Sequence, residues 1–217
     1  MPAPSEKIPF SRRFRRFLPI VVDIETSGLT AHRHAILEIA AVIPSADEAG
    51  RWQIGEIHSV HVEPFEGAEL EASALAFNRI DPFHPFRLAV PEASALEAIF
   101  VPIRAALARS DCLKAVLVAH NAAFDLAFLN AAVTRTGIGK NPFHTFTSFD
   151  TATLSGLMLG QTALPKALRA AGFDWDSASA HSAAYDAERT ARLFFWMVNR
   201  WSDLTALEHS SARVPVG

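Results

Sequence analysis

The chain has 217 residues, half of them apolar, and a net charge of -3 at pH 7. This length is enough for one full-sized domain with a large core. The single cysteine, Cys112, excludes an internal disulfide and cysteine-rich zinc sites. The first apolar run stops at Asp23, too soon for a signal-peptide core or a membrane span. We therefore expect a cytoplasmic protein with no membrane partner.

The charge is unevenly distributed along the chain. Residues 1–16 contain five basic residues against one acid, whereas the remainder contains 15 basic and 22 acidic residues. We expect residues 1–18 to form a basic arm suited to holding a phosphate backbone, because Lys and Arg contacts supply most sequence-independent affinity for nucleic acid. The alternative is a solvated, partly disordered N-terminus.

Two acids follow the first apolar run. Residues 20–22 are typical of a buried strand, and strand alternation places the side chains of Asp23 and Glu25 on the same side. Two neighbouring carboxylates repel each other, so one holds a proton or a cation lies between them. Oxygen-only ligands suit magnesium or manganese. The alternative is a pair of solvated acids at a strand end.

The next segments predict a meander followed by helices. Residues 34–43 and 56–62 are strand-like and joined by a short turn, which favours an antiparallel meander with the first strand. Helical spacing follows in 70–78 and 92–109. Pro102 lies inside the second helix, so we expect a kink there or two shorter helices.

The second half of the chain alternates strands and helices, which predicts a three-layer α/β domain with a mixed sheet over residues 19–205. Residues 206–217 are expected to form a flexible tail. The predicted elements are a strand at 115–119, a helix at 124–133, a strand at 143–149, a helix at 151–159, a short helix at 165–172 and a final amphipathic helix from 184 to 201.

Three more polar residues fall where α/β sheets gather function, at the starts of helices that follow strands. Asp125 lies in the first turn of the helix after the 115–119 strand, and Asp186 opens the last helix. An ordinary acid stabilised by the helix dipole is the alternative for Asp125. His181 precedes Asp186 by five residues and therefore lies on the loop, where a histidine is suited to take a proton from water.

The motifs DIE, NAAFD and HSAAYD, in this order, resemble those of the DEDDh exonucleases. Further segments, HVEPF, ALAFN, VAHNAAFD, NPFH and AHSAAYDAERTA, are similar to the bacterial ribonuclease T family over nearly the whole chain. The resemblance implies a ribonuclease-H-like three-layer fold. In it, a mixed five-stranded sheet with an N-terminal antiparallel meander is flanked by helices.

The resemblance also implies an activity. Members of this family trim the 3′ ends of transfer RNA and other stable RNAs, including ribosomal RNA precursors, degrade single-stranded DNA from its 3′ end, and act as homodimers. By this resemblance His181 is the general base, and two Mg²⁺ ions, with Mn²⁺ as the alternative, are held by Asp23, Glu25, Asp125 and Asp186. A histidine, with an ordinary pKa of about 6.5, accepts a proton near neutral pH, as lysine and arginine do not.

Nucleic-acid contacts are implied in the same way. Phe77, Phe124 and Phe146 match positions whose rings stack on the terminal bases, although most phenylalanines in any fold are core residues. Leu29 and Ser73 stand where the family pattern has an aromatic residue and an acid, so the base preference at the 3′ end is expected to differ. A basic patch that grips RNA away from the active site, facing the partner subunit, corresponds to Arg13, Arg15, Lys114 and Lys140.

Two other classes of function are compatible with parts of this pattern. One is a different DEDDh exonuclease, such as a proofreading subunit or an oligoribonuclease. The other is a nuclease-dead RNA-binding module, which predicts the loss of a carboxylate. All four acids and the histidine are present in this chain.

Overall fold

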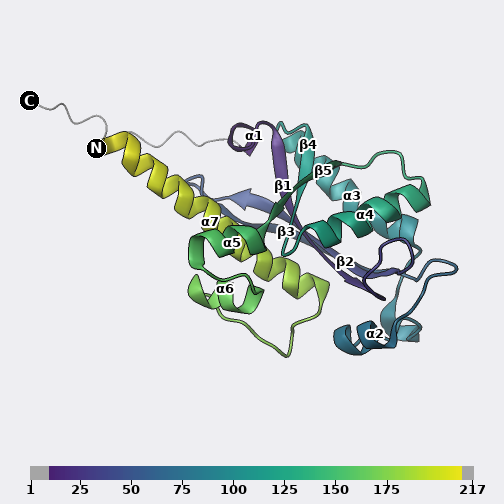
Figure 1. The fold of residues 1–217 in the computed structure, drawn as a ribbon. Coiled ribbons are helices and arrows are strands. Elements are labelled where there is room, and N and C mark those ends of the chain that lie inside the picture. The colour runs from purple at the N-terminus through teal and green to yellow at the C-terminus, as the bar shows by residue number, and fades with distance from the viewer. Residues whose placement is uncertain (1–9, 212–217) are drawn as a thin grey trace, which may run out of the picture.

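The computed structural model describes residues 10–211, with side chains to residue 206. Five strands form one sheet in the order β3-β2-β1-β4-β5, with helices on both faces (Figure 1). Within residues 10–211, no helix combines the length and apolarity needed to cross a membrane. The elements are α1 (Phe10–Arg13), β1 (Phe17–Thr26), β2 (Ile36–Ala46), β3 (Trp52–His61), α2 (Ala72–Asn78), η1 (Pro85–Arg87), α3 (Glu92–Arg109), β4 (Lys114–Ala119), α4 (Ala123–Thr136), β5 (Phe143–Asp150), α5 (Thr151–Leu159), α6 (Leu164–Ala170) and α7 (Ala183–Ser211).

The sheet is mixed, as predicted. Strands β1, β2 and β3 form an antiparallel meander, while β1, β4 and β5 are parallel neighbours. Because β1 is the middle strand, it is hydrogen-bonded on both edges. The carboxyl ends of β1, β4 and β5 meet at one end of the sheet, the place where α/β proteins bind ligands.

Strand β1 is buried on both faces, which explains its continuous apolar run. Leu18, Ile20 and Val22 face a core built with α3 and α4, whereas Val21 faces a second core built with α6 and α7. Figure 1 shows α7 crossing the sheet on the side that also carries α5 and α6. The two cores make the predicted three layers.

Helix α3 is continuous through Pro102. Of the two alternatives expected there, a kink or two shorter helices, the second is therefore wrong. Ile99, Phe100 and Ile103, on both sides of the proline, are fully buried against the sheet. This packing favours one helix even though Pro102 lacks the N–H that would bond the preceding turn.

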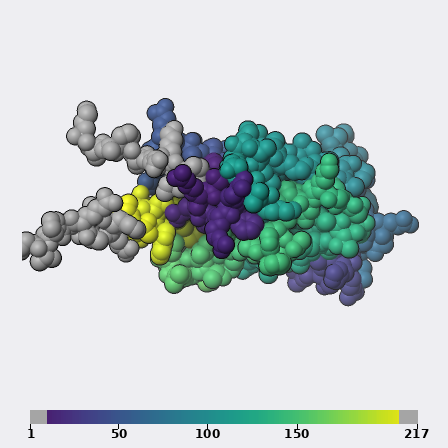
Figure 2. Space-filling model, turned by 90° about the horizontal axis from the view of Figure 1, so that it is seen from above, coloured from purple at the N-terminus to yellow at the C-terminus, as the bar shows by residue number. Residues whose placement is uncertain are grey.

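The described part of the N-terminal arm packs on the domain. Phe10 and Phe14 lie edge-on to Trp52, with ring centroids 4.6 and 5.6 Å away, and Arg16 forms an ion pair with Asp111 at 2.6 Å. Figure 2 shows the segment 10–16, in purple, on the face of the molecule seen from above. The boundary expected between residues 18 and 19 falls inside β1. Residues 1–9 lie outside the described part of the chain.

The C-terminal helix is longer than predicted. Helix α7 runs to Ser211, so residues 206–211 of the expected tail are helical. Residues 212–217 lie outside the described part of the chain. The apolar stripe of α7, with Ala187, Ala191, Phe194 and Val198, is buried on the sheet as its periodicity predicted.

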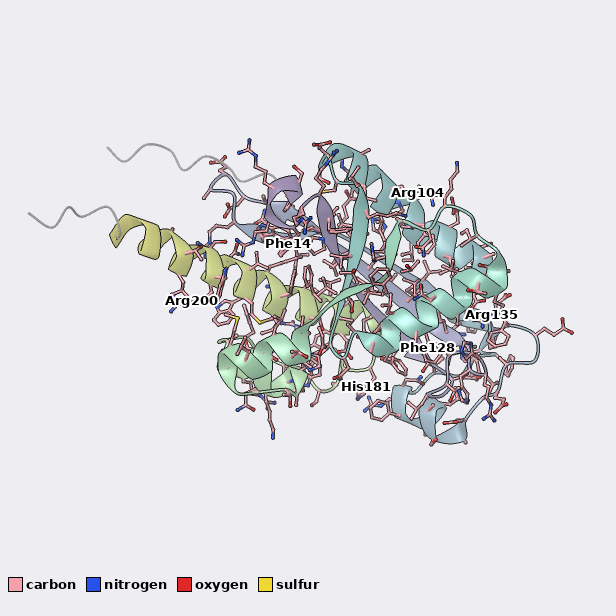
Figure 3. All side chains as sticks on the ribbon, turned by 45° about the horizontal axis from the view of Figure 1, so that its top comes forward. Phe14, Arg104, Phe128, Arg135, His181 and Arg200 are labelled. Carbon is pink, nitrogen blue, oxygen red and sulfur yellow. The ribbon has the colours of Figure 1, made fainter. Side chains whose placement is uncertain are left out.

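A buried ion pair joins the start of α3 to the end of α4. Arg135 donates to both carboxylate oxygens of Glu92, at 2.6 and 2.8 Å, and its guanidinium lies 3.8 Å from the ring centroid of Phe65. The side chains of Arg135 and Glu92 are 24% and 7% exposed. Figure 3 shows Arg135 at the far end of α4.

We predict that Arg135→Met lowers the free energy of unfolding by about 3 to 5 kcal/mol, because it leaves Glu92 buried without its partner. Urea denaturation followed by circular dichroism measures this change. Arg109→Met is the control, since Arg109 pairs with Glu56 at the exposed surface and should change stability by at most about 1 kcal/mol. Equal effects of the two substitutions would contradict the prediction.

Candidate active site

A cavity of about 600 Å³ opens at the carboxyl ends of β1 and β4. Its walls come from β1, the loop after β1, α2, the start of α4 and the loop before α7. The four acids and the histidine that the sequence motifs single out all line it: Asp23, Glu25, Asp125, His181 and Asp186. Segments far apart in the sequence therefore meet at one site.

Strand β1 supplies Asp23 and Glu25. They lie inside the strand, two residues apart, and therefore point to the same face of the sheet. Glu25 lies opposite Glu38 of β2, which is only 6% exposed. Because β1 is the middle strand, these charges are held in a largely buried position.

Asp125 comes from the first turn of α4 and is 5% exposed. The backbone amides of Asp125 and Ile24 donate to its carboxylate. The second of these bonds ties the start of α4 directly to β1. The positive end of the helix dipole also favours a carboxylate in this turn.

Asp186 and His181 come from the start of α7 and the loop before it. The His181 amide donates to Asp186 Oδ2 at 3.3 Å, while Asp186 Oδ1 is buried with no hydrogen-bond partner among the described residues. His181 has a φ of 69°, a left-handed conformation that turns the chain into the helix. Its ring lies 4.2 Å from the ring of Phe77 in α2, and Figure 3 shows His181 on the side of the molecule that carries α2.

The crowding of carboxylates raises their pKa values. Burial raises the pKa of Asp23 well above its ordinary value, and the charges of Asp125 and Asp186 raise it further. Burial, followed by the charge of Asp186, raises the pKa of Glu25 to about 8. Burial likewise raises the pKa of Asp125 and of Asp186. The site therefore lacks positive charge to balance its acids.

The donor set fits a divalent cation. Glu25, His181 and Asp186 each offer one ligand atom, and these atoms lie within 4.8 Å of one another. The unpartnered Oδ1 of Asp186 is a buried acceptor, and such atoms are normally satisfied. Carboxylate oxygens are the ligands that Mg²⁺ and Mn²⁺ prefer. A bound cation would supply the balancing charge.

Comparisons with known proteins identify the family. The family model RNase_T, described as an exonuclease, matches residues 20–194. Ribonuclease T from Marinobacter nauticus is 55% identical over 196 residues, which cover 90% of this chain and 89% of that protein. The chain belongs to the ribonuclease T family of exonucleases. The resemblance that the three motifs indicated is thereby confirmed.

Solved structures of lower identity share the fold. The nuclease domain of 3′hExo, a DEDDh family member bound to rAMP, matches with a TM-score of 0.67 at 16% identity, over 86% of this chain and 94% of that one. Exonuclease I of E. coli in complex with a dT13 oligonucleotide matches with a TM-score of 0.66 at 16% identity, over 88% of this chain. The match spans 43% of the Exonuclease I chain, which is less than half its length. The predicted ribonuclease-H-like fold is confirmed.

The residues expected to contact nucleic acid fall into two groups. Phe77, Phe124, Leu29 and Ser73 line the cavity. Phe77 and Leu29 are 65% and 79% exposed, although large apolar side chains normally bury such surface. Phe146 of β5 is 80% exposed beside His144 and is not among the residues that line the cavity.

The four basic residues lie at the opposite end of the sheet. Arg13 and Arg15 precede β1, and Lys114 is the first residue of β4. The Lys114 ammonium donates to the carbonyl of Asn141 at 3.1 Å, directly after Lys140. The amino ends of β1 and β4 thus carry these charges, while the carboxyl ends carry the acids. Figure 2 shows this end, with the purple arm next to the teal segment that leads into β4.

Two acids of the site were not assigned a function from the sequence. Glu38 accepts a hydrogen bond from Ser59 at 3.1 Å, and its charge raises the pKa of Glu25. Glu71, the residue before α2, lines the cavity. The signal for Glu38 was its position as the single acid in the apolar segment 34–43, because an acid is almost never fully buried unless it is paired. No pattern in the sequence distinguished Glu71.

We predict that the metal-free protein loses thermal stability as the pH rises from about 5 to about 9. The pKa values of these carboxyls are raised in the folded state, with that of Glu25 at about 8, so the folded protein binds more protons than the unfolded chain. Stability is then greatest when the carboxyls are protonated and falls as they ionise. Melting curves in EDTA measure this dependence.

At pH values above the pKa of Glu25, Asp23→Asn is expected to raise the melting temperature measured in EDTA, because it removes one of the crowded negative charges. It should also reduce the dependence of the melting temperature on pH. Glu48→Gln, at an exposed position, is the matched control and should leave the curve unchanged. A lower melting temperature for Asp23→Asn than for the unchanged protein at high pH would contradict this account.

Proposed function

We propose that the protein is a divalent-metal-dependent 3′→5′ exoribonuclease that trims the 3′ ends of transfer RNA and ribosomal RNA precursors and also degrades single-stranded DNA. The observation that supports it most is the meeting of four carboxylates and one histidine in a single open cavity. The 55% identity to a ribonuclease T over nearly the whole chain supports the same substrate class. We expect the enzyme to act in the cytoplasm.

In this proposal Asp23, Glu25, Asp125 and Asp186 hold two Mg²⁺ ions, with Mn²⁺ as the alternative. Bound divalent ions supply positive charge that activates the attacking water and stabilises the leaving 3′ oxygen. The raised pKa values of the four acids fit this role, since a cation would favour their ionised forms. Asp125 is oriented for it by two backbone amides.

His181 acts as the general base. Its ring lies at the cavity wall, half-buried, against the exposed ring of Phe77. The imidazole takes the proton from the attacking water and releases it to solvent through the open side of the cavity. Phe77 and Phe124 stack on the terminal bases, which holds the last phosphodiester near the acids without reading sequence. Phe146, which was expected to stack in the same way, does not line this cavity.

We predict that His181→Ala retains divalent-ion binding but slows single-turnover hydrolysis by about 10² to 10⁴, the usual contribution of a general base. Isothermal titration with Mn²⁺ and quenched-flow cleavage of a 3′-labelled oligonucleotide measure the two properties separately. Because His181 lies within reach of Glu25 and Asp186, a ligand role is the competing explanation. Loss of ion binding in parallel with loss of activity would favour that explanation.

Substrate choice separates this proposal from its nearest rival, another DEDDh exonuclease. A ribonuclease T-type enzyme removes extra 3′ residues from transfer RNA, whereas a proofreading subunit prefers mismatched primer DNA and an oligoribonuclease prefers dinucleotides. Rates on these three substrates, in Mg²⁺ and in EDTA, distinguish the possibilities. A nuclease-dead module is disfavoured because its expected loss of a carboxylate is not seen.

We also propose a homodimer in which the basic patch of Arg13, Arg15, Lys114 and Lys140 serves the cavity of the other subunit. The patch lies at the amino ends of β1 and β4, and the cavity lies at the carboxyl ends of the same strands. Within one subunit the sheet separates the two sites. A strand of RNA held by one subunit would therefore reach the acids of its partner.

We predict that Arg15→Ala combined with Lys140→Ala weakens RNA binding and lowers the salt dependence of the binding constant by about two units, one for each lost phosphate contact. Both positions are exposed, so folding should be unaffected. Mixing this double variant with His181→Ala should restore part of the activity on transfer RNA. Each mixed dimer would combine one intact patch with one intact active site. No recovery on mixing would contradict the dimeric arrangement.

A further inference from the structure

A buried histidine stands behind the wall of the cavity. His34 is 2% exposed, and its ring packs against Gly28, where an added Cβ atom would come within 2.3 Å of the ring. Its Nε2 lies 3.0 Å from Glu71 Oε1. Glu71 itself lines the cavity together with Ser73 and Leu29. His34 thus lies between the loop after β1 and the segment that begins α2.

Both backbone groups of Thr30 lie close to Nδ1 of His34, the amide at 2.9 Å and the carbonyl oxygen at 3.1 Å. When Nδ1 accepts from the nearer amide, Nε2 carries the proton of the neutral ring. The approach of Nε2 to Glu71 is short but not aligned as a straight hydrogen bond, and Nε2 has no hydrogen-bond partner among the described residues. The Glu71 carboxylate is therefore the group that compensates this buried N–H electrostatically.

Hydrogen bonds also hold the backbone of Glu71 in place. The Glu71 amide donates to the carbonyl of Ser27 at 2.8 Å, and the Ser27 hydroxyl donates to the carbonyl of Glu69 at 2.7 Å. On the other side of the wall, Asn78 at the end of α2 donates to the carbonyl of Thr26 at 2.9 Å. These bonds join the loop after β1 to α2, so the position of the Glu71 carboxylate is set before any substrate binds.

A structural role at the helix end does not account for this carboxylate. Glu71 is the N-cap residue of α2, but its side chain makes no capping hydrogen bond. The side chain is 46% exposed on the cavity side, and no hydrogen bond occupies Oε2 in the described part of the chain. A carboxylate there repels the phosphates of a nucleic acid, so a bound strand must turn a base edge toward it. The free carboxylate oxygen of Glu71 can then accept a hydrogen bond from a donor on that edge.

We propose that Glu71, held in place by His34, reads the base in this cavity and favours bases with an exocyclic amino group over uracil. Adenine, cytosine and guanine each present an exocyclic N–H₂ donor on the Watson–Crick edge, whereas the single N3–H donor of uracil lies between two carbonyl oxygens that a carboxylate repels. The inference rests on the proposed exoribonuclease function. It assigns a base-reading role to an acid two positions before Ser73.

The test uses single-stranded RNA oligonucleotides that differ only in the last or the next-to-last nucleotide. We expect the unchanged protein to remove amino-bearing nucleotides about tenfold faster than uridine at one of these positions, as for one hydrogen bond to a charged group. Glu71→Ala should bring this ratio close to one by slowing removal of A, C and G. His34→Gln should give an intermediate ratio, because the carboxylate remains but loses its support.

Glu69→Ala is the matched control. Glu69 lies two residues away, is similarly exposed, pairs with Arg33 and does not line the cavity, so its loss should leave the ratio unchanged. An unchanged ratio in Glu71→Ala, an equal slowing of all four bases, or no preference in the unchanged protein would overturn the inference. Failure of the unchanged protein to degrade any of the oligonucleotides with Mg²⁺ or Mn²⁺ would instead overturn the proposed function.

Discussion

The organisation of this protein depends on the mutual repulsion of carboxylates that are buried at the carboxyl end of β1. Asp23 and Glu25 lie in the middle strand of the sheet, and Asp125 and Asp186 are delivered against them by the first turns of α4 and α7. The two helix N-termini and the amides that donate to Asp125 offset part of this charge. The raised pKa values show that much of it stays uncompensated by the protein itself. The fold thus contains a site whose carboxylates lower its stability unless protons or cations neutralise their charge.

The opposite wall of the cavity serves a different purpose. Hydrogen bonds from Asn78, Glu71 and Ser27 fix α2 to the loop after β1, and exposed Phe77 and Leu29 project from this rigid frame. Of the phenylalanines proposed to contact bases, Phe77 lies in α2, which carries none of the four acids, whereas Phe124 lies in α4 beside Asp125. The ring of Phe77 also touches that of His181. If this wall reads the base as proposed, substitutions in it would alter base preference while the carboxylates keep their positions.

The direction of the strands also separates charge along the molecule. Parallel β1 and β4 have their amino ends at the basic arm and their carboxyl ends at the acids. A polyanionic substrate is attracted to the first end and, without bound cations, repelled from the second. This polarity follows from the sheet topology, and it is the physical argument behind the proposed homodimer, in which one subunit would hold RNA for the active site of the other.

Sequence alone determined the order of the elements, the mixed sheet and the five motif residues, because burial on both faces of β1 and the stripe of α7 leave strong periodic patterns. It also identified the family, since DIE, NAAFD and HSAAYD depend on local spacing. Only the tertiary structure decided that α3 passes through Pro102 unbroken, since packing on both sides of a proline is a long-range effect. Glu38 belongs to the site because strand register places it opposite Glu25, and Glu71 belongs to it next to the buried His34. Both placements depend on contacts between residues distant in the chain. Phe146 stayed outside the cavity for the same reason: position relative to other elements is set by packing, which no local pattern encodes.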